Sequence, residues 1–249
     1  MERAPRMAYC PLGPQNPRGP YRSRPSLQYV NELNWTPGLD PKTGRPLNYD
    51  PNSDVQVYRP GSHGSRANVN GDRLCPSLLG GKNWEPSAYN PELGLLFVTA
   101  KEGCNYIVTK QQDAFVDQGG AVKPRERFAG GQPNTPERLF GSLKAIDPAT
   151  GETKLAAKLD YPTYGGVLAT AGNLIFVGLP DGTLAAYDAK TLKEAWSINL
   201  GTGINAPPVT YSVNGKQYVA VLVGSKQPPA YAPELKNNST ASMVFVFSL

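Results

Sequence analysis

Side chains that commonly ligate metals or carry redox chemistry are few in this chain of 249 residues. It contains three cysteines, Cys10, Cys75 and Cys104, and a single histidine, His63. No Cys-x-x-Cys-His sequence occurs, which excludes covalent attachment of haem. A zinc site built from Cys and His ligands would have to use all four of these residues, and their spacing matches no zinc-binding motif. The sequence therefore offers no metal ligand set of its own.

The formal net charge of +5 is concentrated at the N-terminus, where five arginines fall within the first 24 residues. No platform of interleaved aromatic residues accompanies them, so a solvated, disordered or divergent arm over 1–24 is favoured over a nucleic-acid-binding segment. No apolar run reaches transmembrane length. The first ten residues lack the apolar core of a signal peptide because charges and prolines interrupt them.

Two stretches of the chain repeat one another at an offset of 41 residues. Residues 142–155 contain Asp147, and residues 183–196 contain Asp188 at the matching place. A repeat of about this length with strand–turn–strand content is typical of a β-propeller blade. Each Asp is expected to cap the backbone of its turn. Trp196 is expected to pack between neighbouring blades, with Leu155 at the equivalent place in the other repeat.

Paired strand signals begin near residue 86. Each pair of apolar runs flanks a short turn, and Asn214-Gly215 is the strongest of these turn signals because both residues tolerate positive φ. A last apolar strand, 243–249, is of the kind that closes a propeller ring by pairing with the N-terminal blade. The predicted hairpins have strands at 86–89 and 95–98, at 166–170 and 174–177, and at 208–211 and 217–221.

Residues 105–140 interrupt this pattern with two Gly-Gly pairs and several prolines, and are predicted to form a long insertion loop. The count is then about three blades. Nothing in residues 1–72 has a pattern able to cover the first blade, whose apolar side is expected to face solvent. The predicted fold is all-β: an incomplete β-propeller of about three blades.

Several sequence stretches together identify a family. These are residues 29–35, 38–46, 80–91, 164–172 and 205–211. Through them, residues 25–249 resemble the C-terminal part of the pyrroloquinoline-quinone (PQQ)-dependent alcohol dehydrogenases, which are eight-bladed quinoproteins. The resemblance implies the quinoprotein type of propeller, with the remaining blades supplied by an upstream polypeptide.

The resemblance also implies site residues. Asn83 would hydrogen-bond the quinone and Trp84 would lie beside it; taken by itself, Asn83 is more typical of a turn residue bonded to its own backbone. Tyr164 and Gly165 match an aromatic–glycine pair near the cofactor ring, where tryptophan is common. Gly224 matches the residue before a Trp-Gly-Gly contact to PQQ, although Ser225 follows it here.

A disulfide between Cys75 and Cys104 is a further feature that the resemblance implies. Two free buried thiols are the alternative, and this alternative holds if the chain stays in the cytosol. Cys10 has no partner in either case.

The catalytic Asp and the Ca²⁺ ligands of the family lie upstream of the matched segment. So do its vicinal cysteine pair and the Lys or Arg that polarises the quinone. No catalytic or metal-binding residue is therefore assigned to this chain, and neither Asp40 nor Asp50 matches the family's base.

The predicted function is the C-terminal part of a PQQ-dependent dehydrogenase that oxidises alcohols or similar hydroxyl compounds. As an isolated chain it is expected to be inactive. The family implies the periplasm, although this chain shows no signal peptide. It also implies a separate electron acceptor, such as a cytochrome or a quinone. The alternative is a non-catalytic propeller module that binds a partner through the 105–140 loop.

Overall fold

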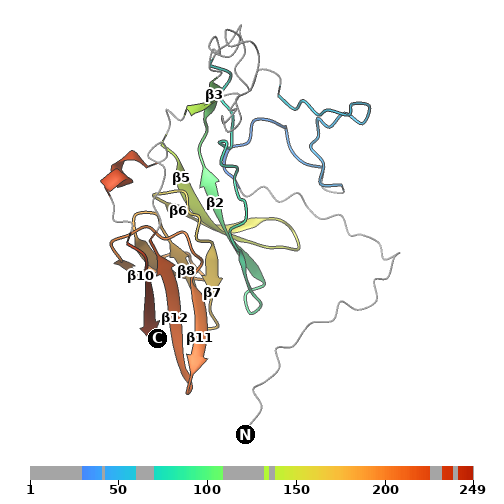
Figure 1. Ribbon diagram of the computed structural model, residues 1–249. Helices are drawn as coiled ribbons and strands as arrows, with labels where there is room; N and C mark the ends of the chain where they lie inside the picture. The colour runs from blue at the N-terminus through green and yellow to red at the C-terminus, as the bar shows by residue number, and fades with distance from the viewer. Residues whose placement is uncertain are drawn as a thin grey trace.

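Strands dominate the computed structural model, which describes residues 30–40, 43–59, 70–108, 132–134, 138–224, 232–237 and 241–248. Three sheets follow one another in chain order (Figure 1). The predicted arm 1–24 lies outside the described residues, as do 109–131 and 135–137 of the predicted insertion. In the described part, no helix is both long enough and apolar enough to cross a membrane.

The three sheets, named blades 1 to 3 here, are antiparallel throughout. Blade 1 has the strand order β1-β2-β5-β6 and blade 2 the order β7-β8-β9-β10, whereas blade 3 has three strands, β11-β12-β13. The bounds are β1 Ala88–Asn90, β2 Leu95–Glu102, β5 Phe140–Ile146, β6 Thr153–Leu159, β7 Val167–Ala169, β8 Leu174–Gly178, β9 Thr183–Asp188, β10 Glu194–Asn199, β11 Val209–Val213, β12 Lys216–Val223 and β13 Met243–Ser248.

All three predicted hairpins are present. The turn between β11 and β12 has positive φ at Asn214 (51°) and Gly215 (78°), as a type I′ turn requires. The predicted insertion separates β2 from β5, which nevertheless pair directly. It contains an unpredicted two-stranded ladder of β3 (Tyr106–Val108) and β4 (Gln132–Asn134). A short 3₁₀ helix, η1, spans Pro233–Asn237.

The predicted Asp caps are confirmed in both repeats. Asp147 Oδ1 accepts the Ala149 N–H at 2.8 Å, and Asp188 Oδ1 accepts the Lys190 N–H at 3.0 Å and the Thr191 hydroxyl at 2.9 Å. These hydrogen bonds favour the charged form and hold the pKa of both carboxyls below the usual value, Asp147 chiefly through the Ala149 amide and Asp188 chiefly through the Thr191 hydroxyl.

The two turns differ at one matching position. Gly151 has φ of 75°, and the repeat places Leu192 there with φ of 53°. Leucine is strained in this region, but the Leu192 side chain is buried in the core between blades 1 and 2. We predict that Leu192→Gly destabilises the fold by a net of about 1–3 kcal/mol, because lost burial outweighs relief of strain.

Urea denaturation of the Leu192→Gly variant would test this prediction. The matched variant Gly151→Ala, at an exposed turn, should lose about 1 kcal/mol through backbone strain alone. A Leu192→Gly variant as stable as the wild type would show that relief of strain fully offsets the lost burial, against this prediction.

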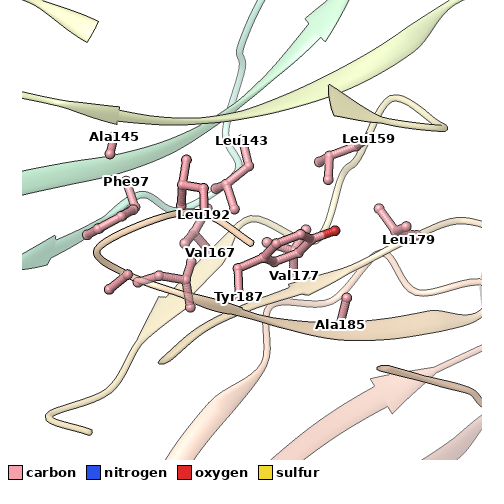
Figure 2. Packing of buried hydrophobic residues seen from close by; sticks show 12 residues of the cluster. Phe97, Leu143, Ala145, Leu159, Val167, Val177, Leu179, Ala185, Tyr187 and Leu192 are labelled. Atoms are coloured by element: carbon pink, nitrogen blue, oxygen red, sulfur yellow. The ribbon is translucent and has the colours of Figure 1, made fainter. Parts of the chain in front are cut away.

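The main core lies between blades 1 and 2, where the two sheets pack face to face (Figure 2). Residues of β2, β5 and β6 oppose residues of β7, β8 and β9 and of the loops that follow β8 and β9. On β8 and β9, alternate residues point to opposite faces, and both faces are covered, which explains their nearly continuous apolar sequence. The core comprises Phe97, Leu143, Ala145, Leu159, Val167, Ile175, Val177, Leu179, Ala185, Tyr187, Ala189 and Leu192.

A second apolar layer joins blade 2 to blade 3. Leu184 and Ile204 pack there with Val221 and Val223. The predicted inter-blade position of Trp196 is confirmed: its ring meets Phe247 of β13 edge to face, with centroids 5.7 Å apart, although 41% of Trp196 remains exposed.

The expectation that blade 1 exposes an apolar side is wrong. Val98, Ala100 and Ile146 point away from blade 2, yet each is at most 2% exposed. A segment far away in the sequence reaches this face: Asn31 donates its N–H to Glu102 at 2.8 Å and accepts from Lys144 Nζ at 2.8 Å. This buried face of blade 1 therefore combines apolar residues with the ion pair of Glu102 and Lys144.

The open apolar face is instead on blade 3, on the side away from blade 2. On this side, alternate residues of β11, β12 and β13 point apolar side chains into solvent. The last strand, β13, pairs with β12 along six residues and is the edge of this sheet among the described residues, so its pairing with the N-terminal blade stays a prediction. The exposed face, called the blade 3 open face below, comprises Val209, Tyr211, Val213, Leu222, Val244 and Val246.

Candidate functional site

The segments that lead into the first strand of each blade meet at one end of the three sheets. The Val167 N–H donates to the Pro86 carbonyl at 3.0 Å, joining blade 1 to blade 2. A Cβ on Gly165 would lie 3.0 Å from the Ala206 carbonyl oxygen, so blades 2 and 3 also approach closely. The Gly224 N–H donates to the Gly203 carbonyl at 2.9 Å. One continuous surface therefore crosses all three blades.

Position 166 has to be glycine, because the loops of blades 1 and 2 lie so close together there. Its φ is 71°, and a Cβ there would lie 2.5 Å from Cδ of Pro86. Any larger side chain would push apart the two loops that join blade 1 to blade 2. Gly166 therefore lets Pro86 lie directly on the start of β7, and Gly165 allows the same close approach by Ala206.

Asn83 and Trp84 lie at the edge of this surface and point into solvent. Trp84 is 62% exposed, an unusual state for so large an apolar side chain. The Asn83 N–H donates to Glu85 Oε2 at 2.9 Å, which fixes the backbone of the turn without using the Asn83 side-chain amide. An exposed indole face next to an exposed amide is suited to a flat, polar-edged ligand.

Beneath these residues lies a buried ion pair that sequence reasoning missed. Lys101 Nζ contacts Glu85 Oε1, and the two side chains are only 3% and 2% exposed. Lys101 Nζ also lies 4.7 Å from the centroid of the half-buried Tyr164 ring. Burial alone would raise the pKa of Glu85, but the hydrogen bonds from Lys101 and from the Asn83 amide outweigh it and hold that pKa below the usual value.

The sequence contains a pattern from which this ion pair could have been predicted. Lys101 shares the strand parity of Phe97, which places its side chain on the core face. A cation on a buried face needs a partner, and Glu85 follows Asn83-Trp84.

The second part of the surface is a depression of about 320 Å³ at the end of blade 3, where the segment before β11 meets the end of β12. Gly224 lies in it with φ of 127°, and a Cβ there would lie 2.5 Å from Oγ of Ser242. The predicted residue Gly224 thus marks another close approach. The lining residues are Asn205, Ala206, Leu222, Val223, Gly224 and Ser242.

The segment leading to Asn83 is tied down by a disulfide. Sγ of Cys75 and Sγ of Cys104 are 2.05 Å apart, and both residues are fully buried. Around the bridge, the Ser77 N–H donates to the Gly103 carbonyl at 2.9 Å and the Leu78 N–H to Asn105 Oδ1 at 2.7 Å. The bridge therefore joins the approach to the site to the end of β2.

Comparison with known proteins decides which family this architecture belongs to. The family model for the β-propeller domain of glucose/ethanol/alcohol dehydrogenases, abbreviated PQQ, matches residues 135–219. The chain is 38% identical over 201 residues to quinoprotein alcohol dehydrogenase PedH of Pseudomonas putida. It is 36% identical over 217 residues to quinoprotein ethanol dehydrogenase of Pseudomonas aeruginosa. These matches cover 79% and 82% of the chain. The chain is a partial propeller of the PQQ-dependent alcohol dehydrogenase type.

Solved structures support the same conclusion. Quinohemoprotein alcohol dehydrogenase from Comamonas testosteroni superposes with a TM-score of 0.66 at 28% identity, over 89% of the chain. A europium-containing methanol dehydrogenase superposes with a TM-score of 0.62 at 25% identity, over 85%. The predicted fold, an incomplete quinoprotein-type propeller, is confirmed.

The partial propeller spans about a third of the length of the curated relatives it matches, 31% and 32% for the two named above. Of the predicted residues, Asn83 and Trp84 are exposed, Tyr164 and Gly224 are half-buried, and Gly165 is buried where blades 2 and 3 approach each other. Asn83 and Trp84 are linked to Tyr164 through Glu85 and Lys101. Gly165 and Gly224 are linked through residues 203–206.

Proposed function

We propose that this chain supplies one side of the cofactor site of a PQQ-dependent dehydrogenase that oxidises alcohols or similar hydroxyl compounds. The observation that carries the proposal is the exposed Asn83–Trp84 pair, at the end of the sheets where the half-buried Tyr164 and the depression at Gly224 also lie. PQQ, when bound, would accept a hydride from the alcohol.

The residues present fit one face of a planar quinone. The Asn83 side-chain amide can donate to a quinone carbonyl, and the exposed Trp84 ring can pack beside the cofactor. Gly165 and Gly224 let the neighbouring loops pack closely beside this face, because a Cβ at either position would meet protein atoms. Tyr164, half-buried over Lys101, would border the ring.

The described residues do not fit the calcium ion of the family. Among them, one group of potential metal ligands gathers within 4.8 Å: Glu32, Cys75 and Cys104. The two cysteines are bonded to each other, whereas Ca²⁺ takes six to eight oxygen ligands. We therefore assign calcium, the catalytic base and the substrate pocket to the remaining blades.

The blade 3 open face supports the proposal that those blades come from an upstream polypeptide. Six large apolar side chains are exposed there in regular alternation, whereas the same alternation on β8 and β9 of blade 2 is buried on both faces. Such a contiguous patch is typical of a surface that is covered in the working assembly. By the same proposal the enzyme acts in the periplasm and passes electrons to a cytochrome or quinone.

Binding of PQQ is the direct test. Fluorescence titration of the chain should give saturable binding, and Asn83→Ala should weaken it about five-fold, the value of one hydrogen bond of about 1 kcal/mol. Asn52→Ala changes another exposed asparagine, in a turn of the 43–59 segment, and should leave binding unchanged. Unchanged affinity in Asn83→Ala would refute the role of Asn83.

Dye-linked alcohol oxidation tests the assignment of the catalytic base and the calcium site to the remaining blades. The isolated chain with PQQ and Ca²⁺ should give no turnover, and turnover should appear when the remaining blades are supplied. Turnover by the chain alone would refute the assignment of the base to another polypeptide. Absence of PQQ binding together with tight binding of an unrelated protein to the chain would favour the alternative, a non-catalytic interaction module.

A further inference from the structure

The buried pair Glu85–Lys101 connects every part of the site that lies on blades 1 and 2. One carboxylate serves two partners, because Oε1 contacts Lys101 Nζ while Oε2 accepts the Asn83 N–H at 2.9 Å. The carbonyl of Glu85 accepts from Lys82 Nζ. Glu85 thus holds the turn that presents Asn83 from both its side-chain and its backbone oxygens.

Lys101 makes the matching set of contacts from β2. Its N–H donates to the Gly81 carbonyl at 2.7 Å, and its ammonium group lies 4.7 Å from the Tyr164 ring centroid. A cation over an aromatic ring is attracted by the negative face of the ring, more strongly when both are shielded from water. Lys101 therefore contacts the residue before the turn and the ring on the neighbouring blade.

We infer that Glu85 and Lys101 are positioning residues, which hold the Asn83–Trp84 turn of blade 1 in a fixed relation to the Tyr164 ring of blade 2. The identity of the ligand that this arrangement serves rests on the proposed function. The arrangement itself rests on the contacts above. Neither side chain needs to touch the cofactor to act, since both are buried beneath the surface.

Burial of an ion pair is by itself weak evidence for a stabilising role, because apolar residues of similar size often do as well. The structure provides a matched control for a merely structural role. Glu102, the next residue on β2, points to the opposite face and pairs with Lys144 at 3.1 Å. These side chains are 2% and 6% exposed, so the two pairs are equally buried and belong to the same blade.

Hydrogen exchange of the full chain, followed by mass spectrometry, separates the two roles. In Glu85→Gln and Lys101→Met, the amides of residues 81–87 should exchange at least ten-fold faster. In Glu102→Gln and Lys144→Met, they should stay within about two-fold of the wild type. Lys101→Arg keeps the cation over Tyr164 and should exchange as slowly as the wild type, and Glu85→Gln provides the test if Lys101→Met does not fold.

PQQ titration of the same variants gives the second measurement. The dissociation constant should rise at least five-fold in Glu85→Gln and less than two-fold in Glu102→Gln. Equal effects of the two pairs on exchange in 81–87 would overturn the inference. If the wild type binds no PQQ, the proposed function fails, and the contrast in exchange alone then decides whether the pair positions the turn.

Discussion

Replacing Cys75 and Cys104 together by alanine is expected to lower the free energy of unfolding by about 3–4 kcal/mol. The bridge joins residues 29 positions apart. In the chain-entropy account, a loop of this length restricts the unfolded ensemble by that amount. Both cysteines are fully buried, so the replacement also removes two packed sulfur atoms.

Equilibrium unfolding in urea measures this change, and a reductant provides its control. A thiol reductant should destabilise the wild type by a similar amount and should leave the Cys75→Ala/Cys104→Ala variant unaffected. If reductant has no effect on the wild type, the two residues are free thiols, the alternative that the sequence left open.

Loss of the disulfide should also weaken binding at the site. Residues 74–78 lie against 103–105, and the same segment continues to Gly81, whose carbonyl accepts from the Lys101 N–H. Without the bridge, this approach to the Asn83 turn is held by hydrogen bonds alone. A variant that keeps native unfolding cooperativity should therefore bind PQQ more weakly than the wild type at temperatures well below unfolding.

Local features of the fold could be predicted from the sequence because their causes are local. The 41-residue offset located β5–β6 and β9–β10, and the two Asp caps followed from residues two and three positions away. Asn214-Gly215 fixed the turn between β11 and β12 through their own tolerance of positive φ.

Non-local features escaped prediction. The predicted strand at 95–98 ended too early, because Lys101 and Glu102 resemble a polar strand end. Their partners, Glu85 and Lys144, are 16 and 42 residues away, and only folding brings them together. The cover on blade 1 depends likewise on Asn31, which lies 113 residues from Lys144. The positions of the site residues came from the family resemblance, whereas the ion pair beneath them is visible only in three dimensions.

The second large effect is expected in a comparison of two leucines, one buried between blades 1 and 2 and one on the blade 3 open face. Leu143→Ala, in the fully buried layer between blades 1 and 2, should cost about 2–5 kcal/mol through lost burial and the cavity left behind. Leu222→Ala removes the same atoms from the blade 3 open face, where Leu222 is 52% exposed, and should cost less than about 1 kcal/mol in the isolated chain. Urea denaturation of both variants measures the difference.

The Leu222→Ala variant can also be tested in the presence of the remaining blades. If an upstream polypeptide covers the blade 3 open face, Leu222 becomes an inter-blade residue like Leu143, and Leu222→Ala should weaken assembly measurably. The substitution should leave the stability of the isolated chain nearly unchanged. Because Leu222 also lines the depression at Gly224, Val246→Ala on the same face, away from the depression, should weaken assembly in the same way if the contact is responsible. A Leu222→Ala chain that restores alcohol oxidation with wild-type affinity for the other blades would show that this face stays open, and that the ring is completed elsewhere.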